Sequence, residues 1–145
     1  SFSLTYSSIS GTARHDMQHT SGGDPAMLQA IRDVNRAQVA AIAAGARRLA
    51  DAGLLDRTVI VWVGDNGEQH HSTASEFPIL LLGGSGVGLR GGGRTVVYPG
   101  VNSSENRQLS NLWNTMGYLA GESLDTFGGE EGDLRKAAGP LGELM

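Results

Sequence analysis

The sequence has no cysteine, and this absence excludes a disulfide framework, a thiolate metal site and a cysteine nucleophile. It has no apolar run of the roughly 18 residues that a membrane helix requires, so we expect no membrane span. The net charge is −4, and a basic stripe is lacking, so nucleic acid is not expected as a partner. Any metal ion therefore depends on histidine, carboxylate or amide ligands.

The composition is that of a globular protein, because hydrophobic residues make up 39% of the chain and charged residues 18%. The 22 glycines cluster in segments that we expect to be loops. The sequence begins with Ser1 rather than methionine. We expect residues 1–145 to be either a single domain or the C-terminal portion of a larger α/β domain.

Hydrophobic periodicity predicts two helices. The first begins at Asp24, an N-cap residue followed by Pro25, and ends at Gly53. The second is capped by Ser103 or Ser104. Its apolar stripe, which we expect to pack in the core, consists of Leu109, Leu112, Trp113, Met116 and Leu119. Residues 121–145 are expected to form a loop with one short turn that ends on the surface.

Apolar and β-branched runs predict strands over residues 58–63 and 79–82, a short third strand over 95–98 and a weak one over 2–6. Continuous apolar runs are typical of parallel strands that are buried on both faces. We therefore expect an α/β fold with a partial, mostly parallel sheet flanked by helices. Two good helices cannot cover both faces of such a sheet, so the chain is expected to need a partner or further strands.

Asp65 and Asn66 directly follow the first buried strand, and sites in open α/β sheets form at the carboxyl ends of strands. A carboxylate and an amide oxygen placed there are ligands suited to a hard cation such as calcium. The alternative is a turn without a site, because Asn66-Gly67 after a β run is a strong hairpin signal.

The four histidines form two pairs. His15 and His19 are four residues apart, which puts both rings on one face of a helix, as metal sites often require. His70 and His71 are adjacent, so on an extended chain one of them at most faces a given site. The alternative is that all four are incidental surface residues of an α/β domain.

The run from Gly86 to Gly91 matches the GxGxxG pattern of dinucleotide-binding proteins. That fingerprint requires a helix immediately afterwards, to bring its N-terminus to the pyrophosphate. Here further glycines and a β-like segment follow, so we interpret residues 83–93 as a glycine-rich loop.

The run LLDRTVIVWVGDNGE resembles the segment of sulfatases, in the alkaline-phosphatase-like superfamily, in which a strand is followed by Ser/Thr-Asp-Asn-Gly-Glu. Over about residues 11–135 the chain is still more similar to an uncharacterised family of exported bacterial proteins assigned to that superfamily. Its pattern is matched by RHDMQH, by HHSTASEFPILLLGGSGVGLRGGG and by LSNLWNTMGYLAGESLDTFG, in that order. The resemblance implies the C-terminal portion of an alkaline-phosphatase-like fold, in an exported or periplasmic protein.

The resemblance also implies a site with a divalent metal, calcium or zinc. The expected metal ligands are His15, His19, Asp65, Asn66 and His70, with His71 as a catalytic general acid. The nucleophile belongs to the missing N-terminal half of the protein, which is therefore an expected partner, and the substrate is a small anionic phosphate or sulfate ester.

Two positions depart from the phosphatase pattern, since His15 replaces an aspartate and Asn66 replaces a histidine. The alternative function is therefore an exported, non-catalytic binding or scaffold protein of the same fold with a degenerate metal site.

Overall fold

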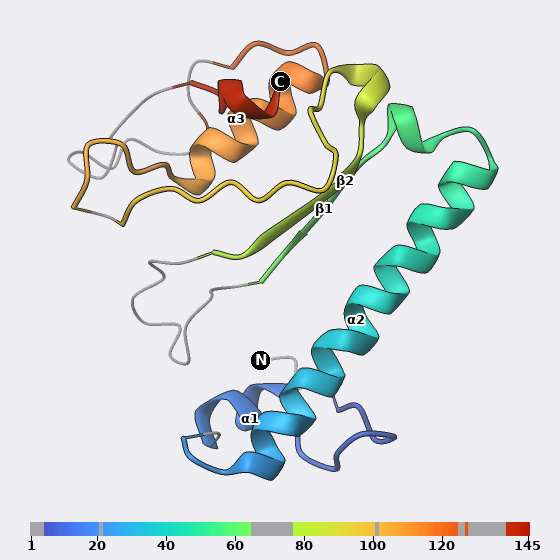
Figure 1. Ribbon diagram of the computed structural model, residues 1–145, viewed down its shortest axis with the longest axis vertical. Coiled ribbons are helices and arrows are strands. Elements are labelled where there is room, and N and C mark those ends of the chain that lie inside the picture. The colour runs from blue at the N-terminus through green and yellow to red at the C-terminus, as the bar shows by residue number, and fades with distance from the viewer. Residues whose placement is uncertain (1–4, 21, 65–76, 101, 125–126, 128–138) are drawn as a thin grey trace.

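The computed structural model describes residues 5–20, 22–64, 77–100, 102–124, 127 and 139–145, and the statements below concern these residues. They form a mixed α/β structure in which a two-stranded sheet lies between a long helix and a shorter one (Figure 1). In chain order the elements are α1 (Arg14–Thr20), α2 (Pro25–Asp51), η1 (Leu55–Arg57), β1 (Val59–Val63), β2 (Ile79–Gly83), η2 (Ser85–Val87), α3 (Leu109–Leu119) and η4 (Gly142–Leu144). No described helix is long and apolar enough to cross a membrane.

Helix α2 has the boundaries that its sequence predicts. The Asp24 carboxylate accepts hydrogen bonds from the backbone N–H groups of Ala26, at 2.9 Å, and Met27, at 3.4 Å. Pro25 lies at the first helical position, where its missing N–H has no cost. Beyond the last turn, Gly53 adopts a φ of 67°, the left-handed conformation that glycine allows.

Strands β1 and β2 pair in antiparallel fashion, with Val59 opposite Gly83 and Val63 opposite Ile79. The expectation of a mostly parallel sheet is therefore wrong for the described strands. Parallel neighbours need a crossover that carries the chain back along the sheet, whereas β2 runs back from the end at which β1 finishes. The apolar runs identified both strands but could not distinguish their relative direction.

The predicted third strand over residues 95–98 is not present, because this segment has no ladder partner. Val97 is 82% exposed, and a β-branched run forms a strand only where a neighbouring strand supplies hydrogen bonds and a packing surface. Of the weak N-terminal strand, Thr5 makes an isolated bridge with Ala13, and residues 2–4 lie outside the described part of the chain.

The glycine-rich segment is a tight packing element rather than a nucleotide loop. Residues 88–100 contain no helix, which agrees with the interpretation of the GxGxxG pattern as a loop. Gly83 has a φ of 77°, and a side chain there would collide with the carbonyl oxygens of Thr58 and Leu55. The adjacent Gly84 N–H donates to the Leu55 carbonyl at 3.0 Å, which holds η2 against η1.

Helix α3 begins later than predicted. Ser103 instead stabilises a turn, in which its hydroxyl accepts from the Glu105 N–H at 3.1 Å. The helix starts after Gln108, whose N–H donates to the Asn111 side chain at 2.9 Å. The residues predicted for its apolar stripe are half-buried, except Leu112, which is buried.

The most buried face of α3 is polar and is covered by the C-terminal segment, residues 139–145. The Asn111 amide donates to the Gly139 carbonyl at 2.8 Å, and the Leu141 N–H donates to the Thr115 hydroxyl at 2.8 Å. Leu141 is buried beside these bonds at 4% exposure. The expected loop therefore contains one buried residue, Leu141, and its predicted short turn is present as η4.

We predict that Leu141→Ala lowers the free energy of unfolding by about 2–4 kcal/mol, because it removes buried methyl groups and leaves a cavity over α3. Urea unfolding monitored by circular dichroism measures the change. Val97→Ala is the matched control, since Val97 is 82% exposed and its truncation should change stability by less than about 0.5 kcal/mol. Equal effects of the two substitutions would contradict the docking of residues 139–145.

Candidate functional site

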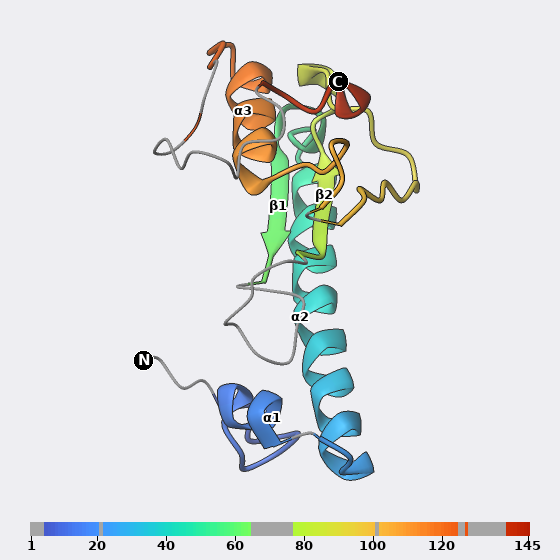
Figure 2. The same cartoon turned by 90° about the vertical axis from the view of Figure 1, so that its left-hand side faces the viewer.

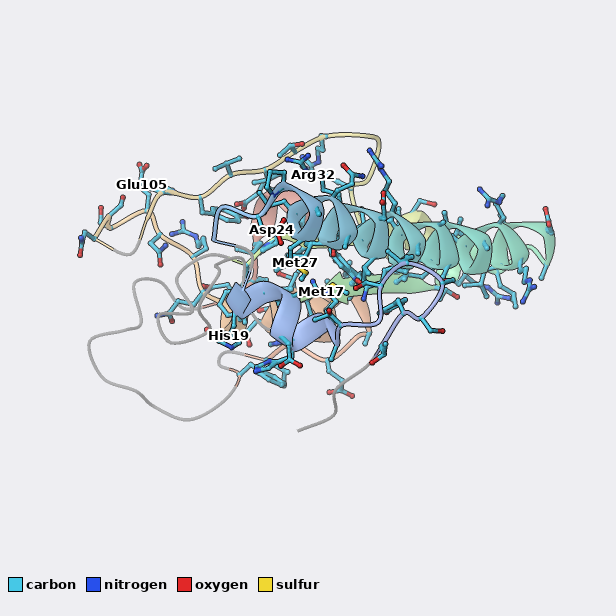
Figure 3. The ribbon with its side chains drawn as sticks, turned by 90° about the horizontal axis from the view of Figure 1, so that it is seen from below. Met17, His19, Asp24, Met27, Arg32 and Glu105 are labelled. Atoms are coloured by element: carbon cyan, nitrogen blue, oxygen red, sulfur yellow. The ribbon has the colours of Figure 1, made fainter. Side chains whose placement is uncertain are left out.

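A buried side chain and polar contacts hold helix α1, and the segment before it, against the N-terminal half of α2. Met17 has no exposed surface and points from α1 toward α2 (Figure 3). The Arg14 guanidinium donates to the Asn35 side chain at 3.2 Å. In the segment before α1, the Tyr6 hydroxyl accepts from the Gln38 amide of α2 at 2.8 Å. The surface of α1 opposite Met17 is therefore held in a defined orientation.

That opposite surface carries His15 and His19. The prediction that their segment is helical is confirmed, and their ring centroids lie 4.6 Å apart at an interplanar angle of 67°. Both side chains are exposed, and Figure 3 shows His19 directed away from α2. An edge-to-face pair of this kind is also a favourable aromatic contact in itself.

The separation of the two rings suits a shared ion. For two imidazoles that bind one zinc ion tetrahedrally through nitrogens at 2.0–2.1 Å, we estimate ring centroids roughly 5 Å apart. The observed 4.6 Å is close to that separation. Two imidazoles supply only half of a four-ligand zinc site, so further ligands must come from elsewhere in the chain.

The other predicted site residues, Asp65, Asn66, His70 and His71, lie outside the described residues. Their prediction as metal ligands, and as a general acid for His71, stays a prediction. Among the residues that the structure describes, no group of three or more histidine, aspartate or glutamate side chains is placed to hold a metal ion. His15 and His19 are the members of the predicted set that lie in the described part of the chain, and the structure brings these two together.

The direction of β1 bears on the remaining ligands. In Figures 1 and 2 the carboxyl end of β1 points toward the end of the molecule at which α1 lies. Asp65 and Asn66 are the second and third residues after β1. The described end of β1, Val63, is therefore the end of the strand nearer to α1.

A second group of titratable residues, which the sequence did not predict, links the C-terminal segment to residues 90–98. The Arg90 N–H donates to the Leu144 carbonyl at 2.8 Å. The Arg94 guanidinium donates to the carbonyl oxygens of Arg90, at 2.9 Å, and Glu143. The contacts join positions about 50 residues apart, and no local pattern in the sequence signals them.

Tyr98 and Glu143 influence each other in this group. Burial, with a contribution from the Glu143 carboxylate, raises the pKa of Tyr98 well above its usual range. The Tyr98 hydroxyl lowers the pKa of Glu143. The buried Tyr98 oxygen makes no hydrogen bond to the described residues. Its interaction with the Glu143 carboxylate is therefore an electrostatic one. The contact links the C-terminal segment to the segment that contains Tyr98.

Comparison of the chain with models of protein families, with curated proteins and with solved structures finds no match.

We predict that Glu143 stabilises the fold at neutral pH and loses this effect in acid. Because its folded pKa is lowered, its contribution is fully present above the ordinary value of 4.5 and disappears as pH falls through the lower folded value. The wild type should have a higher Tm than Glu143→Gln at pH 7, and the difference should vanish near pH 2.

Glu105→Gln is the matched control, since Glu105 is an exposed carboxylate outside this contact. At pH 7 its Tm should differ from that of the wild type by less than the Tm of Glu143→Gln does. A difference for Glu143→Gln that is independent of pH would show that the carboxylate does not interact as described.

Proposed function

We propose that this chain is the C-terminal, metal-ligand-bearing part of a metal-dependent hydrolase of phosphate or sulfate esters, with an alkaline-phosphatase-like fold. The observation that carries the proposal is the placement of the His15 and His19 rings, 4.6 Å apart on one face of α1. The order of motifs along residues 11–135, and above all the Asp65-Asn66 pair after β1, supports it.

The proposed ion takes two ligands from α1, and the others from Asp65, Asn66 and His70. When bound, such an ion would supply Lewis-acid chemistry toward an ester oxygen and toward an attacking group. His15 and His19 hold the ion from a helix that Met17 anchors to α2, so both rings are positioned before the ion arrives. His71 is proposed to protonate the leaving group.

The exposed position of the imidazole pair suits a small anionic ester that approaches from solvent. Both rings lie at the surface rather than in the core, so an anionic group can approach the ion from solvent. The nucleophile is proposed to come from an N-terminal part of the protein, which would approach the same end of the molecule.

The second candidate is an exported, non-catalytic binding or scaffold protein of the same fold. Two sequence observations favour it: a histidine at position 15, where phosphatases have aspartate, and an asparagine at position 66, where they have histidine. A site with these changes can lose its ion while the fold persists. Metal content separates the two candidates.

We predict that the chain binds one Zn²⁺ ion, and that His15→Ala and His19→Ala each weaken binding by at least about tenfold, since each removes a direct ligand. Isothermal titration calorimetry measures the affinity. In the wild type, ¹⁵N resonances of both imidazoles should shift in the same titration.

Glu105→Gln again serves as the control and should bind the ion as the wild type does. Unchanged affinity in both histidine variants would contradict the proposed ligands. A wild type without stoichiometric metal would favour the scaffold candidate.

We predict that the purified chain does not hydrolyse p-nitrophenyl phosphate or p-nitrophenyl sulfate, even with bound metal, because the covalent step lacks its nucleophile. A spectrophotometric assay with saturating zinc or calcium tests this. Turnover that Asp65→Ala abolishes would show instead that the chain is catalytically complete.

A further inference from the structure

Helix α1 is too short to keep its shape alone, so the geometry of the imidazole pair depends on what α1 packs against. It has seven residues, and isolated helices shorter than about 12–15 residues are marginal in water. The His15 and His19 rings lie on this helix with their centroids 4.6 Å apart. Because that separation exists only while the segment is helical, the contacts that hold α1 also hold the ring pair.

The contacts from α1 to α2 lie on a different face of α1 from the histidines. An α-helix turns by about 100° per residue, so the midpoint of Arg14 and Met17 lies about 150° around α1 from the midpoint of His15 and His19. Met17 has no exposed surface, and the Arg14 guanidinium donates to the Asn35 side chain at 3.2 Å. One face of α1 is therefore attached to α2 while another carries the rings.

A short stretch of α2 receives the polar contacts. Asn35 accepts from Arg14, and Gln38, about one turn further along α2, donates to the Tyr6 hydroxyl at 2.8 Å. Tyr6 lies in the segment before α1, whereas Arg14 is the first residue of α1 itself and directly precedes His15. Of the two hydrogen bonds, the one to Asn35 is therefore the one that acts directly on the helix with the rings.

Asn35 also determines where the charge of Arg14 lies. The guanidinium is positively charged at every accessible pH, and its side chain is long and flexible. The bond to Asn35 keeps this charge against α2. Without that acceptor the guanidinium is free to turn toward His15, where it would repel a cation bound by the rings.

We propose that Asn35 is a positioning residue for the imidazole pair and acts on it through Arg14. By accepting from the guanidinium, Asn35 holds the first turn of α1 against α2 and keeps a positive charge away from the ion. The part of this inference that concerns the ion rests on the proposed function. The effect of Asn35 on the ring pair requires no ion.

Zinc titration of the full chain by isothermal titration calorimetry tests the role of Asn35. Asn35→Ala should weaken zinc binding roughly threefold to tenfold, because residues that orient metal ligands affect the affinity indirectly. Asn35→Asp keeps an acceptor for Arg14 and should bind zinc at least as tightly as the wild type. Gln29→Ala is the matched control, since it removes a neutral side-chain hydrogen bond within α2, from Gln29 to Asp33 at 3.0 Å, and should bind zinc as the wild type does.

A nuclear Overhauser effect between the two rings in the metal-free chain separates this inference from the proposed function. The effect should be present in the wild type, in Asn35→Asp and in Gln29→Ala, and weaker in Asn35→Ala. Wild-type ring contact and zinc affinity in Asn35→Ala would overturn the inference and leave the proposed function intact. A wild type that binds no zinc would count against the proposed function, and the ring contact would still decide the role of Asn35.

Two further outcomes would also overturn the inference. A loss of affinity in Asn35→Ala that is absent from neither Asn35→Asp nor Gln29→Ala would show a general weakening of α2, and a loss shared with Asn35→Asp alone would show that the acceptor is not what matters. Circular dichroism establishes whether each variant is folded. If Asn35→Ala does not fold, Arg14→Met removes the same hydrogen bond from the side of α1, and an unchanged ring contact in that variant would overturn the inference.

Discussion

The length and direction of α2 constrain the rest of the structure. Its 27 residues span about 40 Å, and they place the imidazole pair at one end and the start of the sheet at the other. Strand β1 has five residues, so it extends only about 17 Å back toward the α1 end of the molecule. Strand β1 therefore runs back over less than half of the length of α2.

The elements that the sequence predicted well are those with local signals. Asp24, Pro25 and Gly53 define the ends of α2 through interactions within a few residues, and the structure contains each of them. The four-residue spacing of His15 and His19 likewise determines their proximity once the segment is helical. The apolar runs located β1 and β2 because burial of such runs is required wherever they lie.

The features that the sequence did not predict depend on distant partners. The direction of β2 relative to β1 is a property of the pair, and neither apolar run contains it. Residues 95–98 have the composition of a strand but lack a neighbour in the described chain. The sequence did not predict that the polar face of α3 is buried. Asn111 and Thr115 on this face form hydrogen bonds with residues that lie 28 and 26 positions further along the chain. At the candidate site, the four-residue spacing along one helix predicts that His15 and His19 lie close together. Whether the other expected ligands approach this pair depends on the fold of distant segments, which local spacing does not determine.

The docking of residues 139–141 on α3 has a consequence for how the chain acquires its structure. Asn111 and Thr115 form their hydrogen bonds to the Gly139 carbonyl and the Leu141 N–H only when residues 139–141 dock on α3. During synthesis α3 leaves the ribosome before these partners exist, so its polar face stays hydrated at first. Burial of that face is consequently a late step, and a nascent chain that stops before residue 139 would present α3 as a loosely attached, solvated helix.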